Sequence, residues 1–314
     1  MAEILYLVIP CYNEEEMLPL TARAVKEKLQ ALIAAGKISP DSRVLFVDDG
    51  SKDATWHGIS GLHKVDALFC GLKLSRNRGH QNALLAGLTE AKSHADILVS
   101  MDADLQDDIN AIDGFLEKRA EGCDIVYGVR SSREKDTAFK RSTAQGYYKL
   151  LGKMGVEITY NHSDYRLLSK RAAEALSDFR EVNLFLRGIV PMLGFKSDIV
   201  SYVRSERAAG ESKYPLRKMI AFALEGVTSL SVKPIRMITT LGLTIFGISI
   251  AMLIYFLVTY FLDKAVAGWS TIVISIWAIG GLQLFAIGII GEYIGKIYLE
   301  TKSRPKFFIE ERLL

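Results

Sequence analysis

ILVSMDADLQ, residues 97–106, is an apolar run of strand length that ends in two aspartates separated by one alanine. Buried strands read as short apolar runs, and the ligands of open α/β sheets lie just beyond the carboxyl ends of the strands. Residues i and i+2 of an extended segment project to one side, so Asp102 and Asp104 can face the same point. Such carboxylates repel unless a cation, such as Mg²⁺ or Mn²⁺ bridging to substrate phosphates, neutralises them. Taken alone, the stretch leaves a metal site and a pair of solvated loop aspartates equally open.

Length and composition set the limits for the rest of the chain. Its 314 residues give room for a sizeable core, and the net charge of +3 is too small to suggest nucleic acid as a partner. The cysteines at 11, 70 and 123 lack metal-ligand spacing, which predicts buried thiols in a reducing compartment. The N-terminus runs directly into an apolar strand, so we expect no secretory signal.

Strand-like and helix-like segments alternate through the first part of the chain. Strands are expected at residues 4–9, 44–47, 67–74, 97–100 and 124–127, and helices at about 17–35, 53–63 and 80–93. This alternation predicts an α/β fold with a doubly wound, mostly parallel sheet.

Polar residues gather directly after three of these strands, at residues 12–16, 48–51 and 102–106. Because the carboxyl ends of parallel strands meet at one edge of a sheet, the clusters predict a nucleotide-type site there. The chain has neither of the common Gly-rich phosphate loops. Phosphate charge would therefore be met by a metal ion and by cationic side chains.

The last third of the chain changes in character. Residues 215–231 form an amphipathic helical pattern, either an ordinary core-facing helix or, as we favour, a helix lying in the bilayer interface. Residues 237–262 and 269–290 carry no charge and are each long enough to cross a bilayer. We therefore expect an N-terminal domain over 1–214, an interfacial helix over 215–233, two transmembrane helices within 234–298 and a C-terminal tail over 299–314.

Basic residues set the expected orientation in the membrane. They flank the hairpin on its outer sides, whereas the connecting loop carries only Lys264, offset by Asp263. By the positive-inside rule, both termini and the N-terminal domain should face the cytoplasm at the inner or plasma membrane. The flanking residues are Arg217, Lys218, Lys233 and Arg236 on one side and Lys296, Lys302, Arg304, Lys306 and Arg312 on the other.

Four short motifs, in this order and spacing, resemble the family 2 nucleotide-sugar glycosyltransferases of GT-A fold. They are IPCYNE (9–14), VDDGS (47–51), NRGH (77–80) and DADLQ (102–106). Two later segments, DYRLL (164–168) and RAAGESKY (207–214), followed by two apolar runs, look like the polyprenyl-phosphate branch of that family. That branch includes dolichol-phosphate mannose synthases and bactoprenol glucosyltransferases, and the resemblance covers essentially the whole chain.

The resemblance implies a role for particular residues. Nucleotide-sugar binding falls to Pro10, Tyr12, Asn13, Glu14, Asp48, Asp49, Ser51 and Asp102. Asp102, Asp104 and Gln106 match the ligands of the metal (Mg²⁺ or Mn²⁺) and the diphosphate. Lipid-phosphate binding falls to Arg130, Arg141, Ser142, Arg207 and Lys213, although any one arginine is as readily a solvated surface charge. The expected catalytic residues are Asp104, Asp164, Arg207 and Lys213.

The chemistry of the implied reaction agrees with these roles. A lipid phosphate with a second pKa near 6 is largely ionised at neutral pH and can attack an anomeric carbon without a dedicated base. Catalysis then consists of positioning, neutralising phosphate repulsion and stabilising the departing nucleoside diphosphate. Asp164 could orient the sugar or act as a base, or equally form an ion pair with Arg166. For His80 a capping or packing role is favoured over contact with the nucleotide.

The expected activity is inverting transfer of one sugar, glucose from UDP-glucose as first choice, to undecaprenyl or another polyprenyl phosphate. The product would be a β-linked lipid-phosphate sugar for modification of cell-envelope glycans. Two alternatives are a processive polysaccharide synthase, for which the Q-x-x-R-W motif is missing, and a non-catalytic membrane scaffold for a flippase. The resemblance also suggests a homotetramer.

Overall fold

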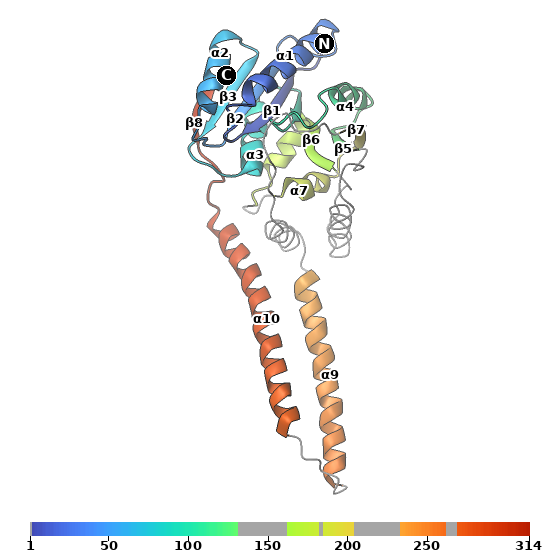
Figure 1. Cartoon of the computed structure of the whole chain (residues 1–314). Coiled ribbons are helices and arrows are strands. Elements are labelled where there is room, and N and C mark those ends of the chain that lie inside the picture. The colour runs from blue at the N-terminus through green and yellow to red at the C-terminus, as the bar shows by residue number, and fades with distance from the viewer. Residues whose placement is uncertain (1, 131–161, 182–184, 204–232, 262–268) are drawn as a thin grey trace. The chain divides into compact units, whose positions relative to one another are not determined.

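The computed structural model describes residues 2–130, 162–181, 185–203, 233–261 and 269–314. The chain divides into two compact units, which we describe separately. The first contains residues 1–149, 157–215 and 303–314, and the second contains residues 150–156 and 216–302. Figure 1 shows a sheet with its helices in the first unit and two long helices in the second. The expected interfacial helix over 215–233 falls, except for its last residue, outside the described residues.

An eight-stranded sheet forms the centre of the first unit, in the order β7-β5-β6-β4-β1-β2-β3-β8. The strands are β1 (Leu5–Cys11), β2 (Arg43–Asp48), β3 (Phe69–Leu74), β4 (Ile97–Ser100), β5 (Ile125–Arg130), β6 (His162–Ser169), β7 (Ser197–Tyr202) and β8 (Ile309–Leu313). β6 runs antiparallel to β4 and β5, and β8 antiparallel to β3, whereas the other pairings are parallel. Six strands thus point the same way, which confirms the mostly parallel sheet.

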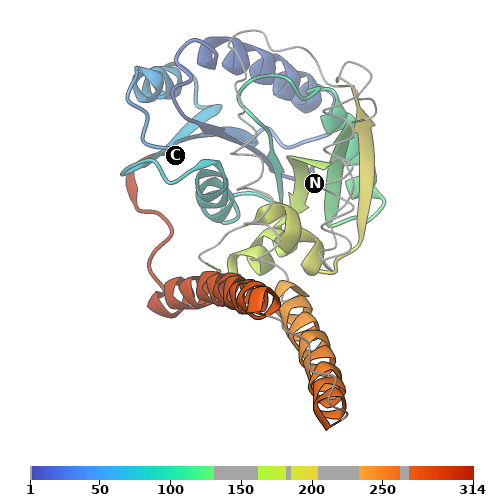
Figure 2. The same cartoon turned by 60° about the horizontal axis from the view of Figure 1, so that its bottom comes forward.

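Helices cover both faces of this sheet. They are α1 (Leu18–Ala34), α2 (Thr55–Val65), α3 (His80–Ala91), α4 (Ala111–Ala120), α6 (Lys170–Ser177) and α7 (Leu186–Met192). Side chains alternate along β1, so Leu5, Leu7 and Ile9 pack with α1, α2 and α4, whereas Tyr6 and Val8 pack with α3, α6 and α7. Figure 2 shows α1 and α3 on opposite faces. The doubly wound arrangement is confirmed.

Strands β1 to β5 and helices α1 to α3 match the expected segments to within a few residues. The sequence did not predict β6, β7 or β8. β6 begins with His162-Ser163-Asp164, and β7 leaves several of its side chains exposed, so neither resembles a buried apolar run.

β8 lies in the segment that the sequence suggested was a tail. It pairs with β3 from Gly71 opposite Leu313 to Leu74 opposite Ile309. Trp56 Nε1 donates to Glu311 Oε2 at 3.1 Å, which ties the strand to α2. The end of the chain, which follows the second long helix, is therefore an edge strand of the N-terminal sheet (Figure 1).

The second unit contains α9 (Lys233–Phe261) and α10 (Trp269–Lys302). Both apolar runs are thus helical, as expected. Among the described residues, one segment passes the length and apolarity required for a membrane crossing, Ile279–Lys302. The hairpin of two transmembrane helices stays a prediction.

The three cysteines are free and buried, as predicted. Cys11 closes β1, and burial raises the pKa of its thiol well above the usual value. A thiol held in this way is protonated and inert.

Gly87 generates the first prediction, because α3 packs on the sheet through this residue. A Cβ at Gly87 would overlap the side chain of Val8 and lie 2.7 Å from Val47 Cγ2. Gly87→Ala should lower the free energy of unfolding by about 1–3 kcal/mol, since the stiff β-branched side chains of Val8 and Val47 cannot move aside. The measurement is the thermal unfolding midpoint of detergent-purified protein, followed by tryptophan fluorescence.

Gly61→Ala is the matched control, because a Cβ at this α2 position meets nothing within 4 Å. It should raise stability by about 0.5–1 kcal/mol, the ordinary gain from replacing glycine within a helix. Similar midpoint shifts for the two variants would contradict the close approach of α3 to the sheet.

Candidate functional site

The loops that follow β1 and β2 are joined by hydrogen bonds through two predicted site residues. Asn13 has a left-handed backbone (φ 53°), and its N–H donates to Ser51 Oγ at 3.0 Å. The N–H of Lys52 donates back to Asn13 Oδ1 at 2.9 Å. Asn13 and Ser51 therefore shape this edge of the sheet through contacts with the backbone.

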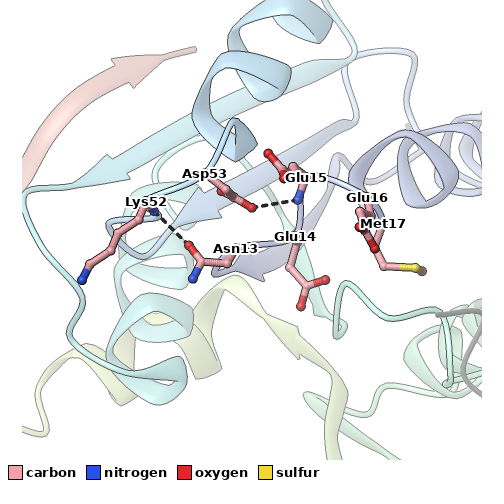
Figure 3. Close-up of a pocket in the computed structure, with 7 residues that line it drawn as sticks. All are labelled: Asn13, Glu14, Glu15, Glu16, Met17, Lys52 and Asp53. Carbon is pink, nitrogen blue, oxygen red and sulfur yellow. Dashed lines mark hydrogen bonds between the residues drawn. The ribbon is translucent and has the colours of Figure 1, made fainter. Parts of the chain in front are cut away.

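A cavity of about 460 Å³ lies over this junction, as Figure 3 shows. It is lined by Asn13, Glu14, Glu15, Glu16, Met17, Lys52 and Asp53. Asp53 Oδ2 accepts from the N–H of Glu15 at 3.2 Å, and Glu15 Oε2 accepts from the N–H of Ala54 at 2.8 Å. Pro10 lies beside it within β1, and Tyr12 exposes 42% of its surface. The size of the cavity falls within the range of small-molecule sites.

Asp48 and Asp49, at the end of β2, are both buried. The carboxylate oxygens of Asp49 accept from the N–H groups of Arg78 and Gly79, at 2.7 and 2.8 Å. Asp48 accepts from the N–H of Ser51 at 3.3 Å, and its second oxygen has no partner in the described residues. Burial raises the pKa of both carboxyls. Asp49 thus fixes the loop that leads into α3.

The DADLQ stretch makes a tight turn where β4 ends. Leu105 adopts a left-handed backbone (φ 52°), and Asp104 Oδ1 accepts from the N–H of Gln106 at 3.2 Å. Thr21 Oγ1, buried in α1, donates to the carbonyl of Ala103 at 2.6 Å. A left-handed leucine is strained, and such strain concentrates where a site needs a particular geometry.

Asp102 is the perturbed carboxyl of this turn. Burial raises the pKa of Asp102 to about 6. His80 lowers this pKa, and the negative charge of Asp164 raises it further. In the described part of the chain no group of three or more histidine, cysteine, aspartate or glutamate side chains could hold a metal ion. Asp102 and Asp104 offer carboxylate oxygens beside one another in sequence, which suits Mg²⁺ or Mn²⁺ when substrate phosphates and water complete the coordination. The donor set fits a metal shared with a substrate.

Asp164 lies at the start of β6 and forms two ion pairs. Arg166 Nη2 lies 2.7 Å from Oδ1, and Arg187 Nη2 lies 3.0 Å from Oδ2. Burial alone would raise the pKa of Asp164, but Arg187, His80 and Arg166 hold it well below the usual value. A carboxylate of such low basicity is a poor general base. Of the roles considered for Asp164, the ion pair with Arg166 is the one that the geometry supports.

Arg130, expected to bind lipid phosphate, contacts an acidic residue in the structure. Its Nη2 lies 3.3 Å from Oδ1 of the buried Asp107, and its Nε donates to the hydroxyl of Tyr202 at 3.4 Å. Arg130 is thus held at the end of β5. The other expected phosphate ligands, Arg141, Ser142, Arg207 and Lys213, lie outside the described residues.

Two residues that were not among the predicted site residues contact carboxylates of the site in the structure. His80 Nε2 lies 3.5 Å from Asp102 Oδ1 and 3.6 Å from Asp164 Oδ2, whereas a capping or packing role was favoured from sequence. Arg187 reaches Asp164 from α7. The NRGH motif already placed His80 beside a predicted binding loop, whereas no sequence pattern pointed to Arg187.

Comparison with known proteins identifies relatives along the whole chain. Residues 6–177 match the family model described as glycosyl transferase family 2. An uncharacterized glycosyltransferase of Bacillus subtilis (strain 168), YkoT, is 53% identical over 98% of this chain and 91% of its own. The bactoprenol glucosyl transferase of Shigella phage SfX is 40% identical over 98% of both chains.

A further relative is the prophage bactoprenol glucosyl transferase homolog of Escherichia coli (strain K12), 40% identical over 97% of both chains. Among solved structures, mannosyl-3-phosphoglycerate synthase from Rubrobacter xylanophilus aligns over 72% of both chains, with 15% identity and a TM-score of 0.48. That structural likeness is too weak to carry an argument.

The pairing of Asp164 predicts a large effect on stability. Arg166 exposes only 2% of its side chain, so Asp164→Asn leaves a buried guanidinium without a full counter-charge. Removing one partner of a buried ion pair lowers the free energy of unfolding by about 3–5 kcal/mol. The thermal unfolding midpoint of the purified protein measures it.

Asp113→Asn is the matched control. Asp113 also contacts two cations, Lys28 and Lys37, but its side chain is 33% exposed. Exposed pairs are worth about 0–1 kcal/mol, so the midpoint should hardly move. If both variants behave alike, Asp164 is not the structural anchor that its contacts imply.

Proposed function

This chain belongs to glycosyl transferase family 2, and from that membership we propose that it transfers a sugar from a nucleoside-diphosphate sugar to a polyprenyl phosphate. The donor proposed first is UDP-glucose, and the acceptor is undecaprenyl phosphate in the cytoplasmic leaflet. Transfer inverts the anomeric centre and gives a β-linked lipid-phosphate sugar for modification of cell-envelope glycans.

One observation carries this proposal: 40% identity to a bactoprenol glucosyl transferase along 98% of both chains. The similarity includes the apolar helices and the C-terminal strand as well as the nucleotide-type site. A match confined to the first 177 residues would have supported sugar transfer without pointing to a lipid acceptor.

The donor is proposed to bind at the carboxyl edge of β1, β2 and β4. Pro10, Tyr12 and Glu14 lie along one side of this edge, with Asp102 and Asp104 after β4. We propose that Asp102, Asp104 and Gln106 hold Mg²⁺ or Mn²⁺ together with the diphosphate. When bound, the ion would neutralise charge that develops on the departing nucleoside diphosphate. Asp48, Asp49, Asn13 and Ser51 support this edge through the backbone contacts described above.

The acceptor needs no protein base, because a phosphate monoester is already largely ionised at neutral pH. This agrees with the low pKa of Asp164. Cations should instead relieve the repulsion between two phosphate groups as they approach. We propose Arg207, Lys213 and Arg141 for this task, and Arg130 once substrate competes with Asp107. Ser142 is proposed as a further, uncharged ligand of the lipid phosphate.

The position of β8 supports the proposed membrane topology. Since β8 pairs with β3, residues 309–313 and the rest of the sheet lie on one side of any membrane. The chain between β7 and β8 must then cross a bilayer an even number of times. Ile279–Lys302 would provide one crossing, and α9, with 29 residues, is long enough for the other. This supports the proposed hairpin with both of its ends on one side of the membrane, and the basic residues that flank it favour the cytoplasmic side.

The direct test uses full-length protein in detergent with undecaprenyl phosphate, Mg²⁺ or Mn²⁺ and a panel of labelled nucleotide sugars. Label from UDP-glucose should pass into the lipid phase, and a chelator should abolish the transfer. Transfer of another sugar would change the donor but keep the reaction. Label extracted as a polymer would favour a processive synthase, and no transfer from any donor would contradict the proposal.

Asp104→Asn tests the proposed metal role at a single residue. The rate should fall by about 100-fold or more, as found when one preorganised group that stabilises developing charge is removed. Asp113→Asn, on the exposed face of α4, serves as the control and should keep the full rate. A normal rate for Asp104→Asn with an unchanged unfolding midpoint would exclude Asp104 as a ligand.

A further inference from the structure

His80 lies where the two halves of the donor site meet. It is the first residue of α3, and its side chain is 43% exposed toward the site. One ring nitrogen, Nε2, lies 3.5 Å from Asp102 Oδ1 and 3.6 Å from Asp164 Oδ2. The imidazole thus separates two carboxylates that would otherwise repel each other.

Each end of this contact is held in place. Asp164 is fixed by Arg166 at 2.7 Å and by Arg187 at 3.0 Å, so the carboxylate on one side of the imidazole cannot turn away. The backbone leading into His80 is fixed as well, because Asp49 accepts from the N–H of Gly79 at 2.8 Å. His80 is therefore tied to β2 through its backbone and to β6 through its side chain.

Asp102, by contrast, has little else to orient it. In the described part of the chain, His80 is the one basic side chain within ion-pair distance of its carboxylate. Asp102 begins the turn that contains the left-handed Leu105, and it exposes 37% of its side chain. A carboxylate that must meet a metal and a diphosphate in a defined orientation gains affinity when a neighbour holds it beforehand.

We propose that His80 is a positioning residue: it holds the carboxylate of Asp102 in the orientation that the metal-bound diphosphate of the donor requires. This role rests on the proposed function, because it needs a nucleoside diphosphate in the site. It also links Asp49 and Asp102, which approach the donor from different strands, through one residue. Removing the imidazole should therefore weaken metal-dependent binding of the nucleotide and leave the fold intact.

The test is calorimetric titration of the full-length protein in detergent with UDP, once with Mn²⁺ and once with a chelator. His80→Ala should weaken UDP binding in Mn²⁺ by about 10-fold or more, the usual effect of losing a residue that orients a metal ligand. Binding in chelator and the thermal unfolding midpoint should be unchanged. His80→Gln, whose amide can still donate toward both carboxylates, should recover part of the loss.

His57→Gln is the matched control, because His57 lies exposed on α2 away from both carboxylates. It should bind UDP as the unaltered protein does. Equal affinity of His80→Ala and the unaltered protein in Mn²⁺ would overturn the positioning role. So would an equal loss with and without Mn²⁺, which would mean direct contact with the nucleotide, or a loss matched by a lower unfolding midpoint.

Failure of the proposed function gives a different result. An unaltered protein that binds neither UDP nor GDP in Mn²⁺ would overturn the proposed donor, and the role of His80 with it. Binding by the unaltered protein together with undiminished binding by His80→Ala overturns the positioning role alone.

Discussion

The site depends on the ion pairs that the carboxylate of Asp164 forms. Arg166 and Arg187 bind it, and His80 contacts it from the helix that follows β3. β6 runs antiparallel to β4, with Arg166 opposite Ser100, so the start of β6 lies beside the end of β4. This reversal of one strand delivers a buried anion and its arginine to the edge where the other strands end. A parallel strand in the same place would have brought them to the opposite edge.

The sequence correctly predicted the strands and helices that its pattern of apolar and polar residues marks. Runs such as residues 44–47 and 97–100 are short, apolar and closed by polar residues, and they became buried strands of a parallel sheet. β6 and β8 escaped prediction because their charged residues are stabilised by partners distant in the chain, as Asp164 is by Arg187 and Glu311 is by Trp56. Nothing local in a sequence records such pairing.

The same holds for the site: the sequence indicates which residues belong to it but not which partners their side chains contact. The sequence correctly marked the loops where polar groups gather, but several of those groups bind the protein itself. Asp49 holds backbone amides, Asn13 and Ser51 join two loops, and Arg130 contacts Asp107. Motifs identify which residues a site uses. Whether a side chain meets the ligand or shapes the loop that does so depends on three-dimensional contacts that the spacing of the motif does not contain.

β8 makes the sheet domain discontinuous, with the two long helices inserted between its seventh and eighth strands. β8 follows both long helices in the chain, so it is synthesised after them. During translation the edge of β3 therefore stays uncovered until both long helices have been made, and an uncovered edge is prone to pairing with other chains. The sheet is complete only after both long helices of the second unit have been made. Residues 309–313 thus couple completion of the sheet domain to completion of its helical insert.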